Sequence, residues 1–441
     1  MEETQTRVLI LHVGGFGDLV LAASLLPLLR TQQPGATITL ACRSEFAALA
    51  LLFPDPPDRI VHVDINPYIW AVPTNELATE TQLLLAQLEP GSFARFYSAE
   101  LRSTWLGPVI AAHVAAPENV ISNLPLTERA FTSSMLRRLG LRAARLQHVR
   151  SDAPIHELAR YRRLAGVDGD PAPLPWTVAP AIADLAIAQL ASLGLEPGRF
   201  IACFPYGSPS TLVKRWDGEN FVRVLKGAQV RWGFDTLLLG AAAERPYLDA
   251  FAAELAKVGV TAAIFAGEPY EFSIVAALLV ASRAYLGNDT GLAHLAQAHQ
   301  IGGATIFGGG MWPSYAPWGP QSIGLVAPLP CFQCYWDCAF GRGVCVERID
   351  VEAVERALRD VIEEPSRAPR TDALERVTAA EATLIALASN TYHQAQEDRG
   401  ARLRALWRLR EVIERALARA ARRSKNQSRG NEMRSGIDGN A

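Results

Sequence analysis

The stretch VLILHVGGFGDLVLAASLLPLLR, from Val8 to Arg30, decides the fold because it joins a buried strand to a helix through a glycine turn. The apolar run VLILHV predicts a strand of a parallel sheet, and the leucine-rich residues 18 to 30 predict a helix. A dinucleotide-binding turn would read G-x-G-x-x-G and would be followed, about 20 residues later, by an acidic residue. The next strand instead ends in Cys42 and Arg43, which disfavours a nicotinamide cofactor.

Asp18 stands at the start of this predicted helix, where the positive end of the helix dipole usually attracts phosphate. A carboxylate there would repel an anion, so the sequence argues against a phosphate at this turn. Two interpretations remain open: Asp18 caps the helix, or it is a general base aimed into a ligand cleft. In the second interpretation Gly14, Gly15 and Gly17 let an acceptor substrate approach the backbone closely.

Strand-like and helical segments alternate along most of the chain, which predicts βαβ units on parallel sheets. In the first half, strands are expected at 8–13 and 36–42, with a further helix from about Glu45. In the second half the pattern predicts strands at 199–204, 235–240, 261–267, 284–289 and 304–309, and helices at 218–232, 244–258, 270–283 and 290–299. The predicted fold class is α/β, with two Rossmann-like, doubly wound domains that place ligands in a cleft beyond the carboxyl ends of the strands.

A proline-rich segment, DGDPAPLPW at 168–176, interrupts the alternation and predicts a domain boundary. We expect an N-terminal acceptor domain at 1–175 and a C-terminal donor domain at 176–350. A closing helix at 351–368, a helical extension at 369–425 and a disordered tail at 426–441 should follow.

The extension is rich in arginine opposite an apolar face formed by Leu403, Leu406, Leu409, Ile413 and Leu417. Such a helix could lie on an anionic inner membrane leaflet, mediate homo-oligomerisation, or stay solvated. All three readings remain open.

Composition bounds the class of protein. The chain has 441 residues, 49% hydrophobic and 20% charged, with a formal net charge of -2. This balance gives no electrostatic case for nucleic acid as a partner. The acidic start MEETQTR predicts no signal peptide, and the run LVLAASLLPLL is shorter than the roughly 20 residues that cross a bilayer. We therefore expect a cytoplasmic protein whose membrane contact, if any, is peripheral.

A phosphate site is predicted at GNDTGLAH, residues 287–294. There a strand ends and a helix opens with Asp289, Thr290 and Gly291, whose N–H groups, together with the Thr290 hydroxyl, suit a diphosphate. His294 lies one turn further along the same face. The alternative is that these residues are ordinary caps and a packed histidine.

The segment KRW, residues 214–216, follows the first strand of the second half. Lys214 and Arg215 could neutralise a departing diphosphate at the carboxyl edge of the sheet. The alternative is a solvated loop anchored by Trp216.

Taken in order, these motifs resemble glycosyltransferase family nine, the ADP-heptose heptosyltransferases of lipopolysaccharide assembly. The matching segments are HVGGFGDLVLAASLLPLLR (12–30), KRW (214–216), LLLGAAAE (237–244), GNDTGLAHLAQA (287–298) and IFGGGMWPSYAPWGP (306–320). The resemblance covers roughly residues 7 to 365 and implies the GT-B architecture of two Rossmann domains. It also implies an inverting transfer of a sugar, most simply heptose, from an ADP-sugar donor.

The resemblance assigns roles to individual residues. It implies that Asp18 deprotonates the acceptor hydroxyl and that Lys214 binds the diphosphate. Further donor-binding positions are implied at Gly240, Glu244, Asp289, Thr290, Gly291 and His294. Because a helix start and a lysine already stabilise the leaving charge, no catalytic metal is required. The acceptor is expected to be a lipid-linked lipopolysaccharide core; the alternatives are a hydroxyl of a surface or autotransporter protein, or a non-catalytic sugar-nucleotide-binding relative.

A cysteine-rich segment, CFQCYWDCAFGRGVC, carries four cysteines with the spacing C-x2-C-x3-C-x6-C. Pairs spaced C-x2-C are common in metal sites. The segment is also similar to a four-cysteine segment that family members often carry, and one branch of the family resembles a case of iron bound in this way. A structural zinc or iron ion is therefore expected on Cys331, Cys334, Cys338 and Cys345, with free thiols as the alternative. Cys42 and Cys203 lie in apolar runs and are expected in the core.

Overall fold

The computed structural model describes residues 6–68, 74–149, 153–169, 174–207, 209–267, 271–364, 368–374, 377–396 and 398. The chain divides into two compact units, residues 1–386 and 387–441, and the fold below is that of the first. The predicted amphipathic helix around residues 403–417 and the predicted tail at 426–441 lie outside the described residues. Among those that are described, no helix is long and apolar enough to span a bilayer.

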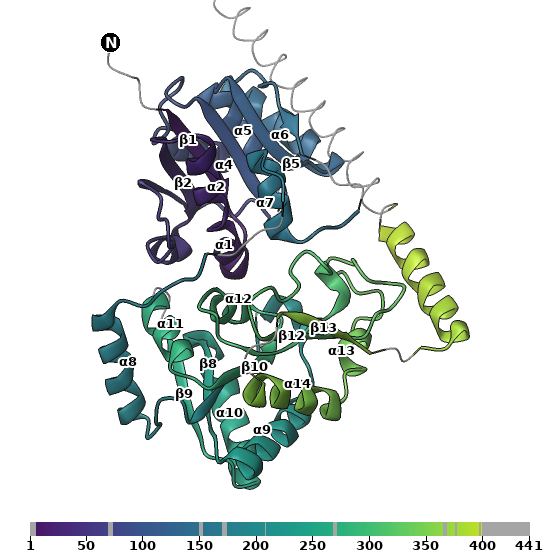
Figure 1. Cartoon of the computed structure of the whole chain (residues 1–441). Helices are drawn as coiled ribbons and strands as arrows, with labels where there is room; N and C mark the ends of the chain where they lie inside the picture. Colours follow the sequence, from purple (N-terminus) through teal and green to yellow (C-terminus); the bar gives the residue numbers. More distant parts are fainter. Residues whose placement is uncertain are drawn as a thin grey trace, which may run out of the picture. The chain divides into compact units, whose positions relative to one another are not determined.

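The first sheet has six parallel strands in the order β3-β2-β1-β4-β5-β6. In chain order the strands are β1 (Arg7–His12), β2 (Thr37–Arg43), β3 (Arg59–Val63), β4 (Arg95–Arg102), β5 (Glu118–Asn123) and β6 (Gln147–His148). The connecting helices are α1 (Phe16–Ala22), α2 (Leu25–Gln32), α3 (Ala47–Ala50), α4 (Asn75–Leu85), α5 (Leu106–Val114), α6 (Leu126–Leu139) and α7 (Glu157–Ala165) (Figure 1).

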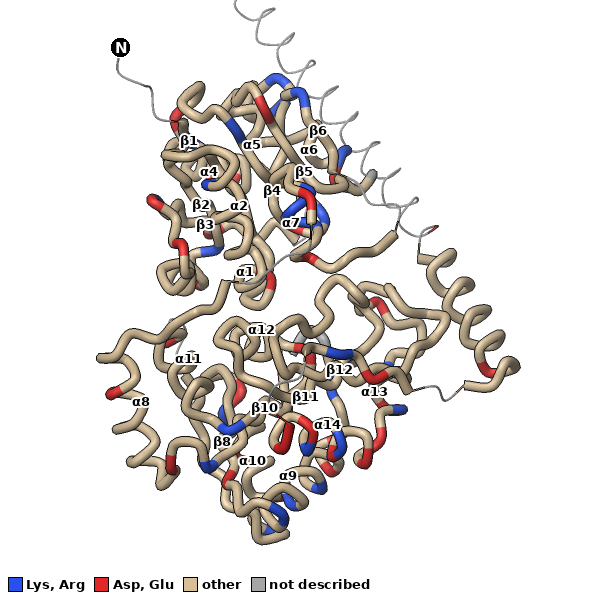
Figure 2. Tube along the Cα trace, in the orientation of Figure 1, with Lys and Arg blue, Asp and Glu red and all other residues tan. Residues whose placement is uncertain are grey.

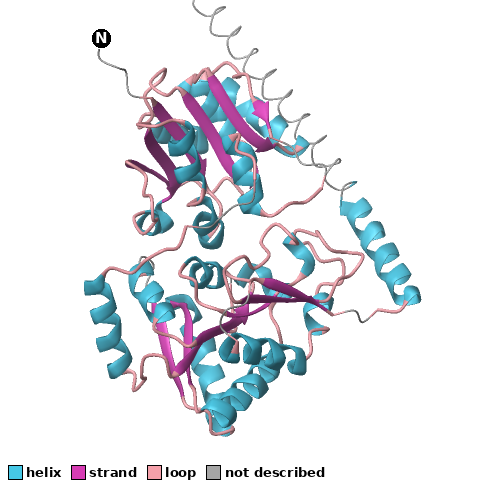
Figure 3. Cartoon of the chain, viewed as in Figure 1, coloured by secondary structure: helices cyan, strands magenta, loops and turns pink. Residues whose placement is uncertain are grey.

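The second sheet has seven parallel strands in the order β13-β12-β11-β10-β7-β8-β9. They are β7 (Phe200–Phe204), β8 (Asp235–Ala241), β9 (Ala262–Gly267), β10 (Ala284–Asn288), β11 (Gly303–Ile306), β12 (Ser322–Val326) and β13 (Arg370–Ala373). Its helices are α8 (Pro180–Ser192), α9 (Gly218–Trp232), α10 (Arg245–Lys257), α11 (Phe272–Val280), α12 (Gly291–Ala298), α13 (Val344–Glu347) and α14 (Val351–Glu363). Helices flank each sheet, as Figure 3 shows, so the predicted α/β, GT-B-like class with two doubly wound sheets is confirmed.

Each sheet is apolar on both faces because helices cover both. In β7, Phe200, Ala202 and Phe204 pack in one cluster with residues of α11 and α12. The alternating residues Ile201 and Cys203 pack in another, with residues of α9, α10 and α14. The predicted core positions of Cys42 and Cys203 are confirmed, since both side chains are fully buried.

Helix α14 illustrates how the outer layer forms. Its buried residues recur at helical spacing, and Asp350 caps its start by accepting the Ala353 N–H at 2.6 Å. Its outward face carries both acidic and basic residues, as does that of α9 (Figure 2).

Two predicted elements differ from those observed. The helix expected over 18–30 is split into α1 and α2, and Ser24 at the break donates its hydroxyl to the Leu21 carbonyl at 2.8 Å. Pro27 lacks an N–H and so cannot continue the hydrogen bonding of α1. The extension expected to be helical from residue 369 begins instead with β13, which pairs with β12; residues 379–396 are helical. The four-residue strand has too little apolar patterning to be seen in the sequence.

Candidate active site

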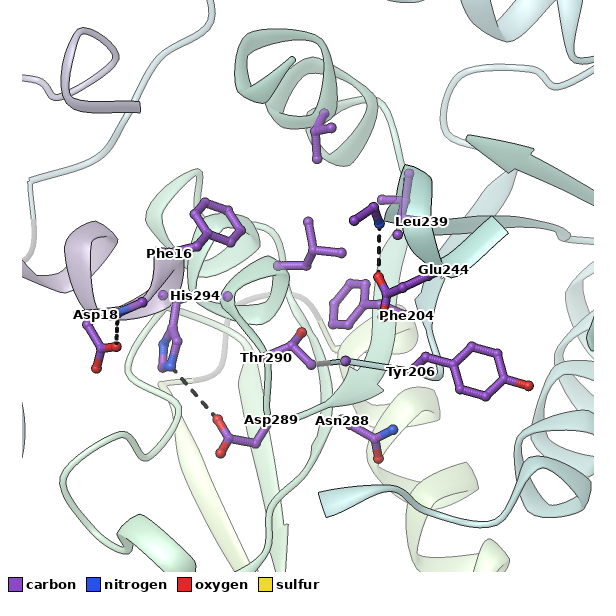
Figure 4. A pocket seen from close by; sticks show the side chains of 18 of the residues that line it. Phe16, Asp18, Phe204, Tyr206, Leu239, Glu244, Asn288, Asp289, Thr290 and His294 are labelled. Atoms are coloured by element: carbon purple, nitrogen blue, oxygen red, sulfur yellow. Dashed lines mark hydrogen bonds and ion pairs between the residues drawn. The ribbon is translucent and has the colours of Figure 1, made fainter. Parts of the chain in front are cut away.

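A cavity of about 780 Å³ lies at the carboxyl ends of strands from both sheets. Figure 4 shows side chains from the two halves pointing into it. Asp18 comes from the first half, and Lys214, Glu244, Asp289, Thr290 and His294 come from the second. Topology explains the convergence, because parallel strands bring all their carboxyl ends to one edge of a sheet.

Asp18 both caps α1 and lines the cavity. Its Oδ2 accepts the Gly15 N–H at 2.7 Å, which satisfies one of the free donors at the helix start. The two interpretations of the sequence are therefore compatible, because one carboxylate oxygen makes the cap while the residue faces the cavity. Its role as a base stays a prediction.

The glycines of the first turn serve close packing. A Cβ at Gly14 would lie 2.9 Å from a His12 ring atom, and one at Gly17 would lie 2.9 Å from the Cα of Gly291. The Gly17 backbone thus contacts the start of α12, so at this position the space expected for an acceptor is taken by the other half of the protein. Gly15 and Gly17 do line the cavity, whereas Gly14 does not.

Lys214 reaches the cavity from the end of the 3-10 turn Pro209–Lys214. Its Nζ lies 3.2 Å from Asp289 Oδ2 and 3.5 Å from the Asp289 carbonyl. Asp289 is 5% exposed, and burial raises the pKa of its carboxyl while the ammonium opposes the rise. Lys214 and Arg215 both line the cavity, and the Asp289 carboxylate partly balances the Lys214 charge.

The loop that carries Lys214 is anchored by Trp216, as the alternative interpretation proposed. Asn288 accepts the Trp216 backbone N–H at 3.1 Å and donates to the Pro205 carbonyl, and the Trp216 ring N–H donates to Ile349 at 2.9 Å. Anchoring and cavity access are compatible, because the buried indole fixes the loop from which Lys214 projects.

The start of α12 offers an unpartnered hydroxyl. Thr290 is the N-cap residue, yet its buried Oγ1 has no hydrogen-bond partner within the described part of the chain. His294 lies one turn further, 5% exposed, and burial lowers its pKa to about 3. This imidazole is therefore neutral at ordinary pH. A free hydroxyl at the positive end of a helix suits a phosphate oxygen.

The end of β8 presents a second polar group. Glu244 accepts the Ala241 N–H through Oε2 at 2.9 Å, while Oε1 is buried and has no hydrogen-bond partner among the described residues. A Cβ at Gly240 would lie 2.9 Å from Glu244 Oε2, so a larger residue would displace this carboxylate. The unpaired carboxylate oxygen is an acceptor suited to a sugar hydroxyl.

A protein-family model matches the part of the chain that carries most of this site. Residues 145–339 match glycosyltransferase family 9 (heptosyltransferase), and this range includes Lys214, Glu244 and all of α12. Residues 145–339 are thus similar to this family. The resemblance stated from the sequence motifs is thereby confirmed for that range.

Solved structures share the fold of this protein. A family 9 glycosyl transferase from Veillonella parvula has a TM-score of 0.64 at 17% identity and covers 82% of this chain and 99% of its own. ADP-heptose lps heptosyltransferase II of E. coli has a TM-score of 0.61 at 16% identity and covers 82% of this chain and 99% of its own. The E. coli heptosyltransferase WaaC, solved with ADP, has a TM-score of 0.53 at 20% identity and covers 80% of this chain and 98% of its own. No curated protein sequence matches the chain.

The cysteine segment at 331–345 shows no metal-ligand set in the described part of the chain. No group of three or more His, Cys, Asp or Glu side chains within the described residues is placed to hold a metal ion. Two of the four thiols bond the backbone: Cys338 donates to the Arg342 carbonyl at 3.1 Å and Cys345 accepts the Gly309 N–H at 3.4 Å. These contacts turn two of the four sulfur atoms towards the backbone, and the described geometry does not support the predicted zinc or iron ion.

Two aromatic residues near this site were not predicted from the sequence. Tyr315 and Trp336 line the cavity, although both stand in loops that carry no helix or strand pattern. Burial and the Asp18 carboxylate raise the pKa of Tyr315 well above its usual value. The only signal for either residue was the unusual aromatic content of the segments around them.

A buried polar network lies behind Asp18. Burial raises the pKa of Glu100 to about 7, although the hydrogen bond that its carboxylate accepts from the Ser98 hydroxyl at 2.6 Å lowers it. Burial lowers the pKa of His12 to about 4. Arg160 pairs with Glu157 at 2.5 Å close by. Neither β4, which carries Glu100, nor α7, which carries Arg160, was predicted from the sequence, so these inward polar residues gave no signal there.

Proposed function

We propose that this protein is an inverting glycosyltransferase that moves heptose from ADP-heptose to a hydroxyl group of a lipopolysaccharide core acceptor. One observation carries the proposal: the Asp18 carboxylate of the first half lines the same cavity as Lys214 and the helix start at Thr290, both of the second half. A base and an anion site on one cavity are what a displacement at an anomeric carbon requires.

In the proposed reaction Asp18 takes the proton of the acceptor hydroxyl as its oxygen attacks the anomeric carbon. The new C–O bond forms as the bond from that carbon to the diphosphate oxygen breaks, so ADP leaves from the opposite face and the configuration inverts. Lys214 and the start of α12 at Thr290 stabilise the charge that develops on ADP. This chain's own groups supply that stabilisation, so the proposed mechanism includes no metal.

Donor recognition is assigned to the end of β8. The free Oε1 of Glu244 would accept a ribose hydroxyl, and Gly240 lets the nucleotide approach the backbone. A carboxylate acceptor near the ribose reads hydroxyl groups but does not by itself choose the base. The choice of ADP over other nucleotides is thus the part of the proposal that needs a direct measurement.

A thermal-shift panel of nucleotide sugars tests the donor. A ligand at 100 times its Kd stabilises the folded state by about 2.7 kcal/mol, so ADP-heptose should raise Tm while UDP- and GDP-linked sugars should not. Transfer to heptose-deficient lipopolysaccharide, followed by mass spectrometry, then tests the acceptor. A shift by UDP-sugars alone would remove the ADP-heptose proposal and leave the fold assignment intact.

A further inference from the structure

Trp336 lies against the cation of the donor site. The Lys214 Nζ is 4.5 Å from the centre of the Trp336 ring, and both residues line the cavity. Tryptophan is the best cation–π partner among the aromatic side chains. The ammonium therefore has two fixed neighbours, the indole face and the Asp289 carboxylate at 3.2 Å.

The Cys loop, defined as residues 331–345, holds the indole in place. A Cβ at Gly308 would lie 2.8 Å from a Trp336 ring atom, and one at Gly310 would overlap the ring. The Tyr335 N–H donates to the Gly310 carbonyl at 2.9 Å, so the backbone beside Trp336 is docked on the same glycine turn. Glycine at these two positions is required for the ring to rest on the backbone.

The loop adopts a costly backbone to present this ring. Gln333, Tyr335 and Trp336 have φ angles of 70°, 51° and 65°, a left-handed region that non-glycine residues rarely occupy. Such conformations persist only where the surrounding structure fixes them, and they cluster at functional sites. The Gln333 N–H bond to the Gly309 carbonyl at 2.7 Å supplies part of that fixation.

We propose that Trp336 is a positioning residue for Lys214, and that the Cys loop serves to hold its indole against the ammonium before the donor arrives. A free lysine side chain samples many rotamers, which a diphosphate would have to order on binding. An ammonium already held by an indole and a carboxylate loses less entropy. The inference rests on the proposed ADP-sugar function, since it assigns Trp336 to the diphosphate end of that donor.

Calorimetric titration of ADP and of adenosine into the full-length protein tests the proposal. Trp336→Leu should weaken ADP binding about 2- to 30-fold, the range expected for a lost cation–π contact. Trp336→Phe should lose less, because it keeps an aromatic face. Adenosine, which lacks the diphosphate, should bind all variants equally. The matched control is Tyr335→Leu, which should bind ADP normally. Tyr335 is adjacent to Trp336, stacks on Arg102 and does not line the cavity.

A double-mutant cycle with Lys214→Met separates positioning from general damage. If Trp336 acts through the ammonium, Trp336→Leu should have no further effect on ADP affinity in the Lys214→Met background. An undiminished effect in that background, or an equal loss of adenosine binding, would overturn the proposal. If Trp336→Leu folds poorly, Gly310→Ala serves in its place. It displaces the ring without removing it and should cause the same loss of ADP affinity. A wild-type protein that binds no ADP would overturn the proposed function itself, which is a distinct result.

Discussion

Replacing Asp18 by asparagine separates its two tasks. The amide oxygen can still accept the Gly15 N–H that Oδ2 accepts at 2.7 Å, so the cap on α1 should survive and stability should change by less than about 1 kcal/mol. The proton acceptor is lost. Removing a general base costs about 2 to 4 orders of magnitude in rate, which corresponds to about 3 to 5 kcal/mol of activation free energy.

The assay pairs kcat, measured from ADP release, with Tm and with the Kd for ADP. We expect kcat to fall at least about 100-fold while Tm and Kd stay close to wild type. Asp217→Asn is the matched control: Asp217 caps α9 by accepting the Glu219 N–H at 2.8 Å, and it does not line the cavity. An Asp18→Asn enzyme within tenfold of the wild-type kcat would refute the assignment of the base.

Two further predictions concern stability. Burial raises the pKa of Glu100 from 4.5 to about 7, so the charged carboxylate disfavours the folded state. The free energy of unfolding therefore falls as pH rises from about 4.5 through 7, by about 3 kcal/mol at pH 8. Glu100→Gln should remove this fall. Parallel denaturant titrations at pH 5 and pH 8 measure it, and an unchanged pH dependence would argue against a buried, titrating Glu100. Gly291→Ala would force a Cβ into the Phe16 ring and to 2.9 Å from the Gly17 nitrogen, and overpacking of this kind costs about 1 to 3 kcal/mol. The control is Gly227→Ala inside α9, where the Cβ meets only the Glu355 side chain; if both variants lose equal stability, the close contact of α1 with α12 is not what requires glycine.

Local pattern predicted most of the second half. The helix expected at 218–232 coincides with α9, and the strands expected around 235, 262, 284 and 304 appear as β8 to β11. These elements are long or strongly apolar, so their periodicity is a direct imprint of burial on both faces of a parallel sheet. The break at Ser24 and the short strand β13 were missed because each depends on one or two residues.

The candidate donor residues were also visible in sequence order. Each follows a predicted strand, and parallel topology then requires that they share one edge of the sheet. Lys214, Glu244 and Thr290 do line one cavity, in keeping with that argument. The cysteine spacing predicted a metal site less well, because spacing fixes which thiols are near one another but not which way each sulfur points.

By itself, then, the sequence determined the parallel βαβ pattern, most strands of the second sheet and the identity of the polar residues at the strand ends, because those depend on neighbours within about one helix or strand. The outer strands β3 to β6 of the first sheet were not predicted. Only the tertiary structure decided that Gly17 meets Gly291, that Tyr315 faces Asp18 and that Trp336 rests on Lys214. These contacts join residues far apart in the chain through irregular loops. Their existence depends on how closely two backbones pack, which no local pattern records.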